Sequence, residues 1–154
     1  MTPAVEAAKR AGLAVVLHHY DGVEVGDGDY ALAVAERLGV EPGRLFKTLV
    51  AAVGGELRVF VVPADRQFDL KAAGKRAELA DAAAAERATG YVVGGISPLG
   101  QRRRLPTTLD ESALGHETIL VSAGRRGLQM ELDPRALAQL LGADVRRIAR
   151  PPNG

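Results

Sequence analysis

The sequence predicts one mixed α/β domain, and three observations lead to this fold class. A chain of 154 residues, 47% hydrophobic and 25% charged, has about the size of one domain and can build an apolar core. Segments with helix signals alternate with β-branched segments along the whole chain. The sequence also contains no internal repeat, composition break or long linker. We therefore expect a single domain over residues 1–150, followed by a frayed tail at 151–154.

The first elements follow from local signals near the N-terminus. Thr2-Pro3 is a helix start and Gly12 is a stop, so a short helix lies between them. Residues 15–20 are rich in β-branched and aromatic side chains and predict a strand. The polar, glycine-rich residues 22–29 then form a loop that leads into a helix over 30–38, which ends at Gly39.

The clearest local pattern in the sequence is a β-hairpin. Residues 46–53 and 56–62 are β-rich and flank Gly54-Gly55, and primed hairpin turns need the positive φ that glycine adopts. The remaining expected elements are helices at 69–75, 81–87 and 133–142, and extended segments at 91–93, 105–109, 118–122 and 127–132.

Composition excludes several classes of protein. The chain has no cysteine, which removes disulfides, thiolate metal sites and a thiol nucleophile on the protein, and fits a reducing compartment. It has no apolar run of the roughly 18 residues that a membrane span needs and no secretory leader, so we expect a cytoplasmic protein. A net charge of +1 argues against a general nucleic-acid coat but leaves room for a local basic surface.

A glycine-rich segment at 89–100 is the first candidate for a ligand site. It reads TGYVVGGISPLG and is followed at once by Arg102–Arg104. Glycine permits positive φ and lets successive N–H groups point at one oxygen or anion. The alternative is a turn that only reverses the chain. The arginines here and at 125–126 suit phosphate contacts, although any one such arginine is more often solvated surface charge.

Lys47 is the second candidate, because it lies inside the first hairpin strand. Alternation along a strand places Phe46 and Thr48 on one face and Lys47 and Leu49 on the other. A lysine among apolar neighbours either covers the sheet with its stem or supplies a cation to the floor of a pocket. The residues alone leave both interpretations open.

Metal and serine-hydrolase chemistry receive little support. His18 and His19 are adjacent in a predicted strand and point to opposite faces, and His116 stands alone, so we expect no metal site. Ser97 and Ser122 are possible nucleophiles by residue type only. No Gly-x-Ser-x-Gly motif surrounds either serine, and no His-Asp pair is identifiable to activate it.

Taken together and in order, a set of motifs spanning nearly the whole chain resembles the bacterial YbaK family of Cys-tRNA(Pro) deacylases, relatives of the prolyl-tRNA synthetase editing domains. These motifs are the N-terminal MTPAV, FKTL at 46–49, DLK at 69–71, the glycine segment 89–100, RLPT at 104–107, Asp110, and VSAGRRGL at 121–128. The resemblance implies a curved mixed sheet surrounded by helices. It also implies a deacylase that acts in trans, beside prolyl-tRNA synthetase, on mischarged tRNA(Pro), without cofactor or metal.

The resemblance also assigns site residues. The family's signature lysine corresponds to Lys47 and its site tyrosine to Tyr20. The expected catalytic set is Lys47, Tyr20, Gly94, Gly95, Ser97, Gly100 and Ser122. The expected substrate-binding set is Phe46, Thr48, Ile96, Pro98, Gly124 and Gln129. Gln129 stands where the family pattern has an aspartate, which puts a carboxylate role at that position in doubt.

The chemistry implied by the resemblance needs no nucleophile from the protein. The cysteine thiol of the substrate attacks its own ester carbonyl and expels the terminal tRNA hydroxyl. Backbone N–H groups of residues 94–100 would stabilise the oxyanion, and Lys47 would hold a phosphate or the ester region. Two alternatives stay open at this point: a deacylase for alanyl or seryl esters, and a non-catalytic adaptor that binds tRNA or synthetase.

Overall fold

The computed structural model describes residues 1–25 and 29–152. Its helices are α1 (Pro3–Arg10), α2 (Tyr30–Leu38), α3 (Leu70–Ala73), α4 (Ala82–Thr89) and α5 (Pro134–Leu141), with 3-10 turns η1 (Pro42–Arg44) and η2 (Glu111–Gly115). Its strands are β1 (Val16–His19), β2 (Phe46–Val53), β3 (Glu56–Pro63), β4 (Gln67–Phe68), β5 (Ala77–Leu79), β6 (Thr107–Asp110), β7 (Ile119–Arg125), β8 (Leu128–Leu132), β9 (Asp144–Arg146) and β10 (Ala149–Arg150). Helices and strands alternate along the described chain, which confirms the predicted mixed α/β class.

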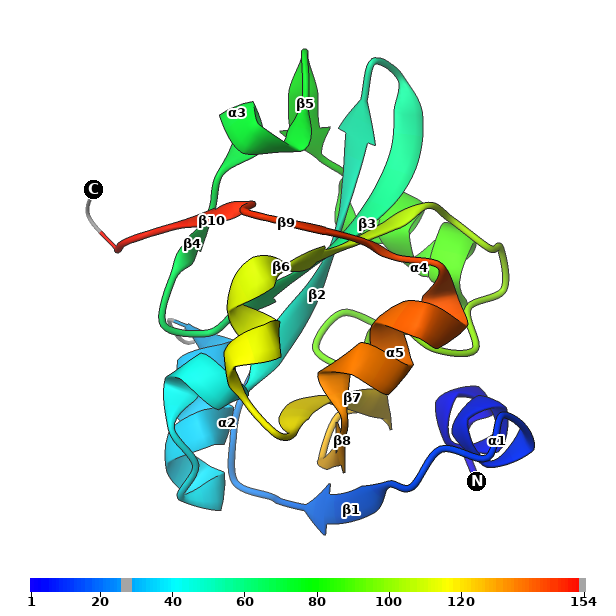
Figure 1. The fold of residues 1–154 in the computed structure, drawn as a ribbon, viewed down its shortest axis with the longest axis vertical. Coiled ribbons are helices and arrows are strands. Elements are labelled where there is room, and N and C mark those ends of the chain that lie inside the picture. Colours follow the sequence, from blue (N-terminus) through cyan, green and yellow to red (C-terminus); the bar gives the residue numbers. More distant parts are fainter. Residues whose placement is uncertain (26–28, 153–154) are drawn as a thin grey trace.

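The largest sheet is mixed and has the strand order β5-β2-β3-β6-β9. The hairpin β2–β3 runs through the middle of the molecule (Figure 1), and its strands pair antiparallel from Phe46↔Pro63 to Val53↔Glu56. Strands β6 and β9 join it in parallel. A second sheet, β1-β8-β7, is antiparallel and meets the first through a parallel bridge between Leu45 and Leu120.

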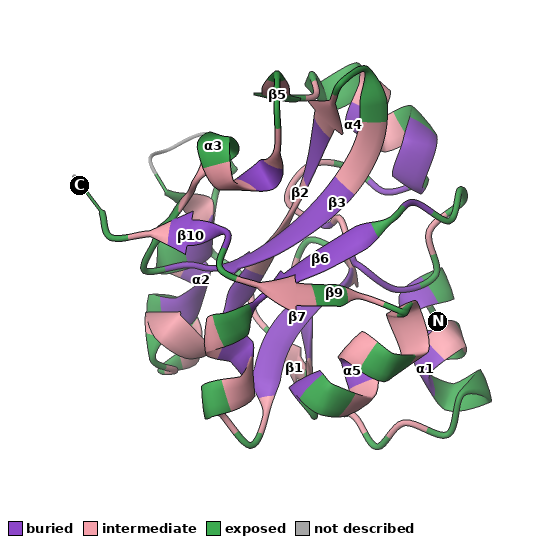
Figure 2. Ribbon diagram, turned by 45° about the horizontal axis from the view of Figure 1, so that its top comes forward, coloured by how far each residue is buried: buried purple, intermediate pink, exposed green. Residues whose placement is uncertain are grey.

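The core lies on both faces of the central hairpin. Figure 2 shows buried residues along β3, β6 and β7. One face of β2 contributes Phe46 and Val50 to a cluster with α1, α4, α5 and β7, while Ala51 packs on the other face with Phe60. The alternation predicted for this strand is therefore confirmed.

Local capping explains where the helices start and stop. Thr2 accepts a hydrogen bond from the Val5 N–H and caps α1, and Asp29 caps α2 in the same way through the Leu32 N–H. Helices α2 and α5 end at Gly39 and Gly142, which adopt φ of 71° and 60°. These starts and stops agree with the sequence signals.

One predicted element is wrong, and several short ones were missed. The segment 91–93 is an irregular turn rather than a strand. Tyr91 is buried, its hydroxyl donates to the Leu99 carbonyl at 2.6 Å, and the Val93 N–H donates to Glu86 Oε2, so tertiary contacts override the β propensity of these residues. The missed strands β4, β5, β9 and β10 are two or three residues long. The predicted loop at 22–29 and the predicted tail at 151–154 each lie partly outside the described residues.

Gly100 lies where the glycine segment approaches α1 closely enough to leave no room for a side chain. It has φ +68°, and a Cβ there would lie 2.6 Å from the backbone of Pro3. Gly142 has a similar φ of +60° with no atom within 4 Å of such a Cβ. Gly142→Ala should cost about 1 kcal/mol of unfolding free energy, from backbone strain alone. Gly100→Ala should cost roughly 2–4 kcal/mol, because a clash with backbone adds to the same strain.

Urea denaturation of both variants beside the unmodified protein measures this difference. An equal loss in the two variants would show that the Gly100–Pro3 contact is unimportant.

Candidate active site

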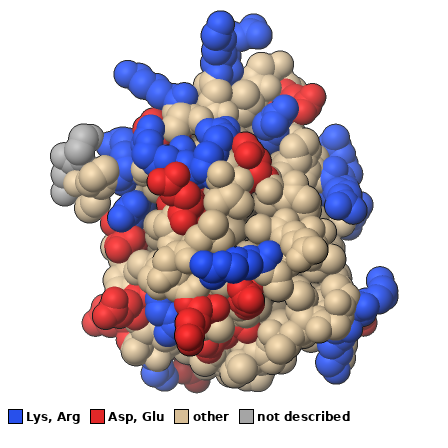
Figure 3. All heavy atoms as spheres, in the orientation of Figure 1, with Lys and Arg blue, Asp and Glu red and all other residues tan. Residues whose placement is uncertain are grey.

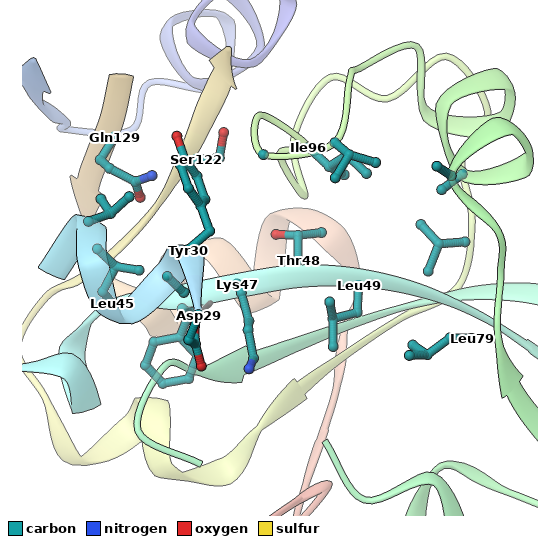
Figure 4. A pocket seen from close by; sticks show the side chains of 18 of the residues that line it. Asp29, Tyr30, Leu45, Lys47, Thr48, Leu49, Leu79, Ile96, Ser122 and Gln129 are labelled. Atoms are coloured by element: carbon teal, nitrogen blue, oxygen red, sulfur yellow. The ribbon is translucent and has the colours of Figure 1, made fainter. Parts of the chain in front are cut away.

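A cavity of about 550 Å³ opens beside the N-terminal half of β2. Its walls come from five parts of the described chain: β2 with the preceding Leu45, the start of α2, the segment from β5 to α4, the loop at 93–96, and the strands β7 and β8. The lining includes Tyr30, Val34, Leu45, Phe46, Lys47, Thr48, Leu79, Ala85, Gly94, Ile96, Ser122 and Gln129. Figure 4 shows how these side chains surround the cavity.

The cavity lies where no strand among the described residues pairs with the outer edge of the N-terminal half of β2. Strand β5 pairs only with residues 51–53 of β2, and the Ala80 N–H then donates to the Val50 carbonyl. In a two-residue hairpin the residues flanking the turn form the hydrogen-bonded pair, here Val53 and Glu56, and the pattern alternates from there. The N–H and C=O of Thr48 therefore point away from β3, toward the open edge.

One end of the cavity carries uncharged polar side chains in apolar surroundings. Ser122 on β7 and Gln129 on β8 lie directly opposite each other in the strand register, on the face that also carries Leu120. Thr48 points toward this end from β2 (Figure 4). Gln129 is only 5% exposed, yet its Oε1 and the Thr48 Oγ1 have no hydrogen-bond partner among the described residues. The Ser122 Oγ accepts a hydrogen bond from the Gly124 N–H.

Two tyrosines meet at the entrance to α2. Tyr30, the first residue of the helix, lines the cavity, and its hydroxyl lies 2.7 Å from that of Tyr20, which follows β1. Burial, followed by this hydrogen bond, raises the pKa of Tyr30 above its ordinary value of 10.0. Tyr20 does not line the cavity itself; it supports the Tyr30 ring that does. Tyr20 was expected at the site from the sequence and Tyr30 was not, although an aromatic side chain directly after the helix cap Asp29 was a signal for it.

Lys47 lies on the side of β2 opposite to Thr48 (Figure 4) and still reaches the cavity lining along the open strand edge. Its ammonium forms no ion pair or hydrogen bond with another residue that the structure describes. The other charged lining residue is Asp29. The cavity thus has an available cation beside a neutral polar end.

The glycine segment contributes one edge of the cavity through Gly94 and Ile96. Arg126 holds this edge in place, because its Nε donates to the Val93 carbonyl at 2.8 Å. Gly95 packs on the β7–β8 turn, where an added Cβ would lie 2.8 Å from the Arg125 backbone. The Gly95 N–H donates to the Val92 carbonyl, so it is already used within the loop.

The other predicted site residues lie outside the cavity lining. Ser97 is buried, and its Oγ accepts from the Leu99 N–H. Pro98 and Gly100 line a separate cavity of about 230 Å³ next to α5. Gly124 is packed against Tyr91. The structure therefore brings together Lys47, Phe46, Thr48, Gly94, Ile96, Ser122 and Gln129, and places Tyr20, Gly95, Ser97, Pro98, Gly100 and Gly124 behind or beside them.

The described residues contain no cluster of three or more histidine or acidic side chains that would hold a metal ion. None of the described helices combines the length and apolar character of a membrane span. On the face in Figure 3, basic and acidic side chains are interspersed rather than gathered into one positive surface.

The sequence of this chain is similar to known proteins of one family. Residues 27–140 match the family model described as aminoacyl-tRNA editing domain. The chain is 42% identical over 125 residues to the Enterococcus faecalis protein named "Putative Cys-tRNA(Pro)/Cys-tRNA(Cys) deacylase EbsC", covering 77% of this chain and 76% of that protein.

Solved structures with the same fold as this chain support the family match. One titled "putative trans-editing enzyme for prolyl tRNA synthetase" superposes with a TM-score of 0.80 at 25% identity, over 97% of this chain and 99% of the other. The structure of hypothetical protein APE2540 gives a TM-score of 0.84 at 26% identity, over 96% and 99% of the two chains.

The Tyr20–Tyr30 contact predicts a measurable titration. Tyr20→Phe removes the hydroxyl that helps to keep Tyr30 protonated, so the pKa of Tyr30 should fall toward 10.0 while staying raised by burial. The chain has three tyrosines and no tryptophan, so tyrosinate absorbance can be followed without interference. Tyr91, whose pKa burial raises to about 12, serves as the internal control. An unchanged titration curve for Tyr30 in the variant would contradict the contact.

Proposed function

The chain belongs to the aminoacyl-tRNA editing domain family, and we propose that it is a deacylase acting in trans that releases cysteine from mischarged Cys-tRNA(Pro). Two printed names support this substrate: the E. faecalis relative is named as a Cys-tRNA(Pro)/Cys-tRNA(Cys) deacylase, and one similar solved structure is titled as a trans-editing enzyme for prolyl tRNA synthetase. We further propose that residues 1–150 form the deacylase domain and that the protein works in the cytoplasm.

The observation that carries the mechanism is the absence of an activated nucleophile among the described lining residues. The hydroxyls that line the cavity belong to Tyr30, Thr48 and Ser122. No described histidine or carboxylate forms a hydrogen bond with any of them. A serine or threonine hydroxyl needs such a base to attack an ester at neutral pH. The attacking group therefore comes from the substrate or from water.

We assign attack to the thiol of the esterified cysteine. Its sulfur forms a bond to the ester carbonyl carbon, the bond from that carbon to the ribose oxygen breaks, and the thiol proton ends on the released ribose hydroxyl. The resulting cyclic thiolactone is then hydrolysed by water. An intramolecular attack of this kind gains a high effective molarity when the enzyme holds the reacting atoms in line.

The residues of the cavity then act by position and charge. The Lys47 ammonium, without a partner among the described side chains, is available to a phosphate of the terminal nucleotide or to the oxygen that becomes negative in the transition state. The apolar walls at Val34, Leu45 and Ile96 exclude water and strengthen this electrostatic interaction. Alanine would fit beside them but brings no attacking group, which gives selectivity without a tight steric filter.

Deacylation of Cys-, Ala- and Ser-tRNA(Pro) under the same conditions tests the proposal. The protein should release cysteine at least about a hundredfold faster than alanine or serine, because only cysteine supplies a nucleophile of sufficient strength. Equal rates on all three esters would contradict substrate-assisted attack and favour a general deacylase.

Adding prolyl-tRNA synthetase should raise the rate at low tRNA concentration, since a net charge of +1 supports few phosphate contacts.

Lys47→Ala is the matching variant, and Lys71→Ala, on the short helix α3 and outside the cavity, is its control. Loss of a group that stabilises developing charge should lower the rate on Cys-tRNA(Pro) by about a hundredfold while tRNA binding persists. If the unmodified protein and Lys47→Ala both bind tRNA but release equally little cysteine, the protein is an adaptor rather than an enzyme.

A further inference from the structure

Four polar side chains form a hydrogen-bonded network behind the cavity, here called the Glu131 cluster. Glu131 on β8 is its centre: its Oε1 lies 2.8 Å from Nε2 of His18 on β1, and its Oε2 accepts from Thr118 Oγ1 at 2.5 Å and from Arg44 Nη2 at 3.1 Å. Arg44, in the turn η1, also donates to the Thr118 carbonyl at 3.3 Å and to the Thr118 Oγ1 at 2.8 Å. None of these four residues belongs to the cavity lining.

The cluster lies where the two sheets meet. Arg44 directly precedes Leu45, whose backbone bridges to Leu120 of β7, and Glu131 stands opposite Leu120 in the pairing of β7 with β8. Among the four side chains of the cluster, that of Arg44 comes from the segment leading into β2, and the other three come from β1, β8 and the residue before β7. The guanidinium of Arg44 therefore ties the start of β2 to the second sheet.

The strands joined by the cluster carry the cavity walls two or three residues further on. Because side chains alternate along a strand, Glu131 shares a face of β8 with Gln129, and Leu120 shares a face of β7 with Ser122. On the other side of the joint, Lys47 is the third residue after η1. A change in the angle between the sheets at the cluster would therefore move Lys47 relative to the opposite wall of the cavity.

The chemistry of the cluster suits it to fixing one angle more than to stabilising the fold. A guanidinium is a planar fork, so binding a carboxylate and a carbonyl together fixes direction as well as distance. Hydrogen bonds from Thr118 and His18, followed by the charge of Arg44, lower the pKa of Glu131 below its ordinary value of 4.5, so this carboxylate is ionised at neutral pH. The side chains of Glu131 and Arg44 are 24% and 32% exposed, and ion pairs that water reaches contribute little to the free energy of unfolding.

We propose that Glu131 is a positioning residue for deacylation, which through Arg44 sets the distance of β2 from β7 and β8 and thereby the place of Lys47 in the site. The inference rests on the proposed function, because the reaction it concerns is the release of the amino acid. Attack within a bound ester depends on close placement, and a misplacement of about 1 Å can cost about a hundredfold in rate. Loss of the cluster should therefore slow the chemical step more than it weakens tRNA binding.

Two substitutions at Glu131 separate geometry from charge. Glu131→Gln and Glu131→Leu remove the same negative charge, but only glutamine keeps an acceptor oxygen for Arg44 and Thr118. In single-turnover deacylation of Cys-tRNA(Pro) at saturating protein, Glu131→Leu should be about tenfold slower than the unmodified protein, whereas Glu131→Gln should stay within about threefold of it. The two variants should bind the tRNA with the same Kd, because phosphate contacts depend on charge.

Two further variants complete the kinetic experiment. Arg44→Lys keeps the cation but not the fork, so it should slow the reaction as Glu131→Leu does, and it preserves the test if the leucine variant fails to fold. Glu56→Leu makes the same change at an exposed ion pair near the hairpin turn, where Glu56 Oε1 lies 3.3 Å from Arg58 Nη2. This control should leave the rate unchanged.

A distance measurement reports on the joint without requiring catalysis. The chain has no cysteine, so spin labels can be attached at Val16→Cys on β1 and Glu78→Cys on β5, two exposed positions in different sheets. The distribution of distances between the labels should be broader in Glu131→Leu than in the unmodified protein, and it should be unchanged in Glu131→Gln.

The inference is overturned if Glu131→Leu and Glu131→Gln release cysteine at the same rate, or if Glu131→Leu is slower while the distances between the labels are unchanged. A loss of tRNA affinity that accounts for the whole effect would also overturn it. Failure of the proposed function has a different signature. The unmodified protein would then release no cysteine, while the label distances would still decide whether Glu131 holds the two sheets in place.

Discussion

The incomplete pairing of β2 is the constraint on which the rest of the site depends. This strand pairs with β3 over eight residues but with β5 over only three, so none of the described strands pairs with the outer edge of its N-terminal half. An open strand edge inside a small domain would normally be covered or would invite another strand. Here the start of α2, the loop at 93–96 and the second sheet surround it, the second sheet pairs only through the bridge between Leu45 and Leu120 just before β2, and a cavity remains. Both faces of one strand can therefore contribute to one site, with Thr48 on one side and Lys47 on the other.

The glycine segment at 89–100 contributes to the cavity mainly through close packing. Gly95 and Gly100 lie where a Cβ would meet the backbone of β7 and α1, within 2.8 Å and 2.6 Å respectively. Their lack of a side chain lets the loop approach the sheet closely enough to close the cavity wall at Gly94 and Ile96. Arg126 fixes the loop from the β7–β8 turn through the Val93 carbonyl, so one of the arginines suggested by the sequence for phosphate contact has a structural task.

Much of the fold could be predicted because it depends on local signals. Caps such as Thr2 and glycine stops such as Gly39 specify helix ends, and the pair Gly54-Gly55 specifies the central hairpin with its alternation. The turn at 91–93 could not be predicted, since its conformation is fixed by the Tyr91–Leu99 and Val93–Glu86 contacts, which join residues apart in sequence. The short edge strands carry too few residues for any periodicity to appear.

The site was predicted less completely than the fold, because it is formed by contacts between residues that lie apart in the sequence. The motif around Lys47 and the positions of Ser122 and Gln129 were accessible from resemblance, but their meeting at one cavity depends on how two sheets approach each other at Leu45 and Leu120. Tyr30 was missed because only the tertiary structure brings its hydroxyl to Tyr20.

In the proposed mechanism the cavity supplies position and polarity, and the reactive sulfur belongs to the substrate. Single-turnover deacylation of Cys-tRNA(Pro) and of the same ester with its sulfur methylated tests it most directly. Methylation should abolish release while binding of the esterified tRNA is retained, because the walls of the cavity accept an apolar group but the described residues hold no other nucleophile in place. Release of the methylated amino acid at the rate of cysteine itself would contradict the claim.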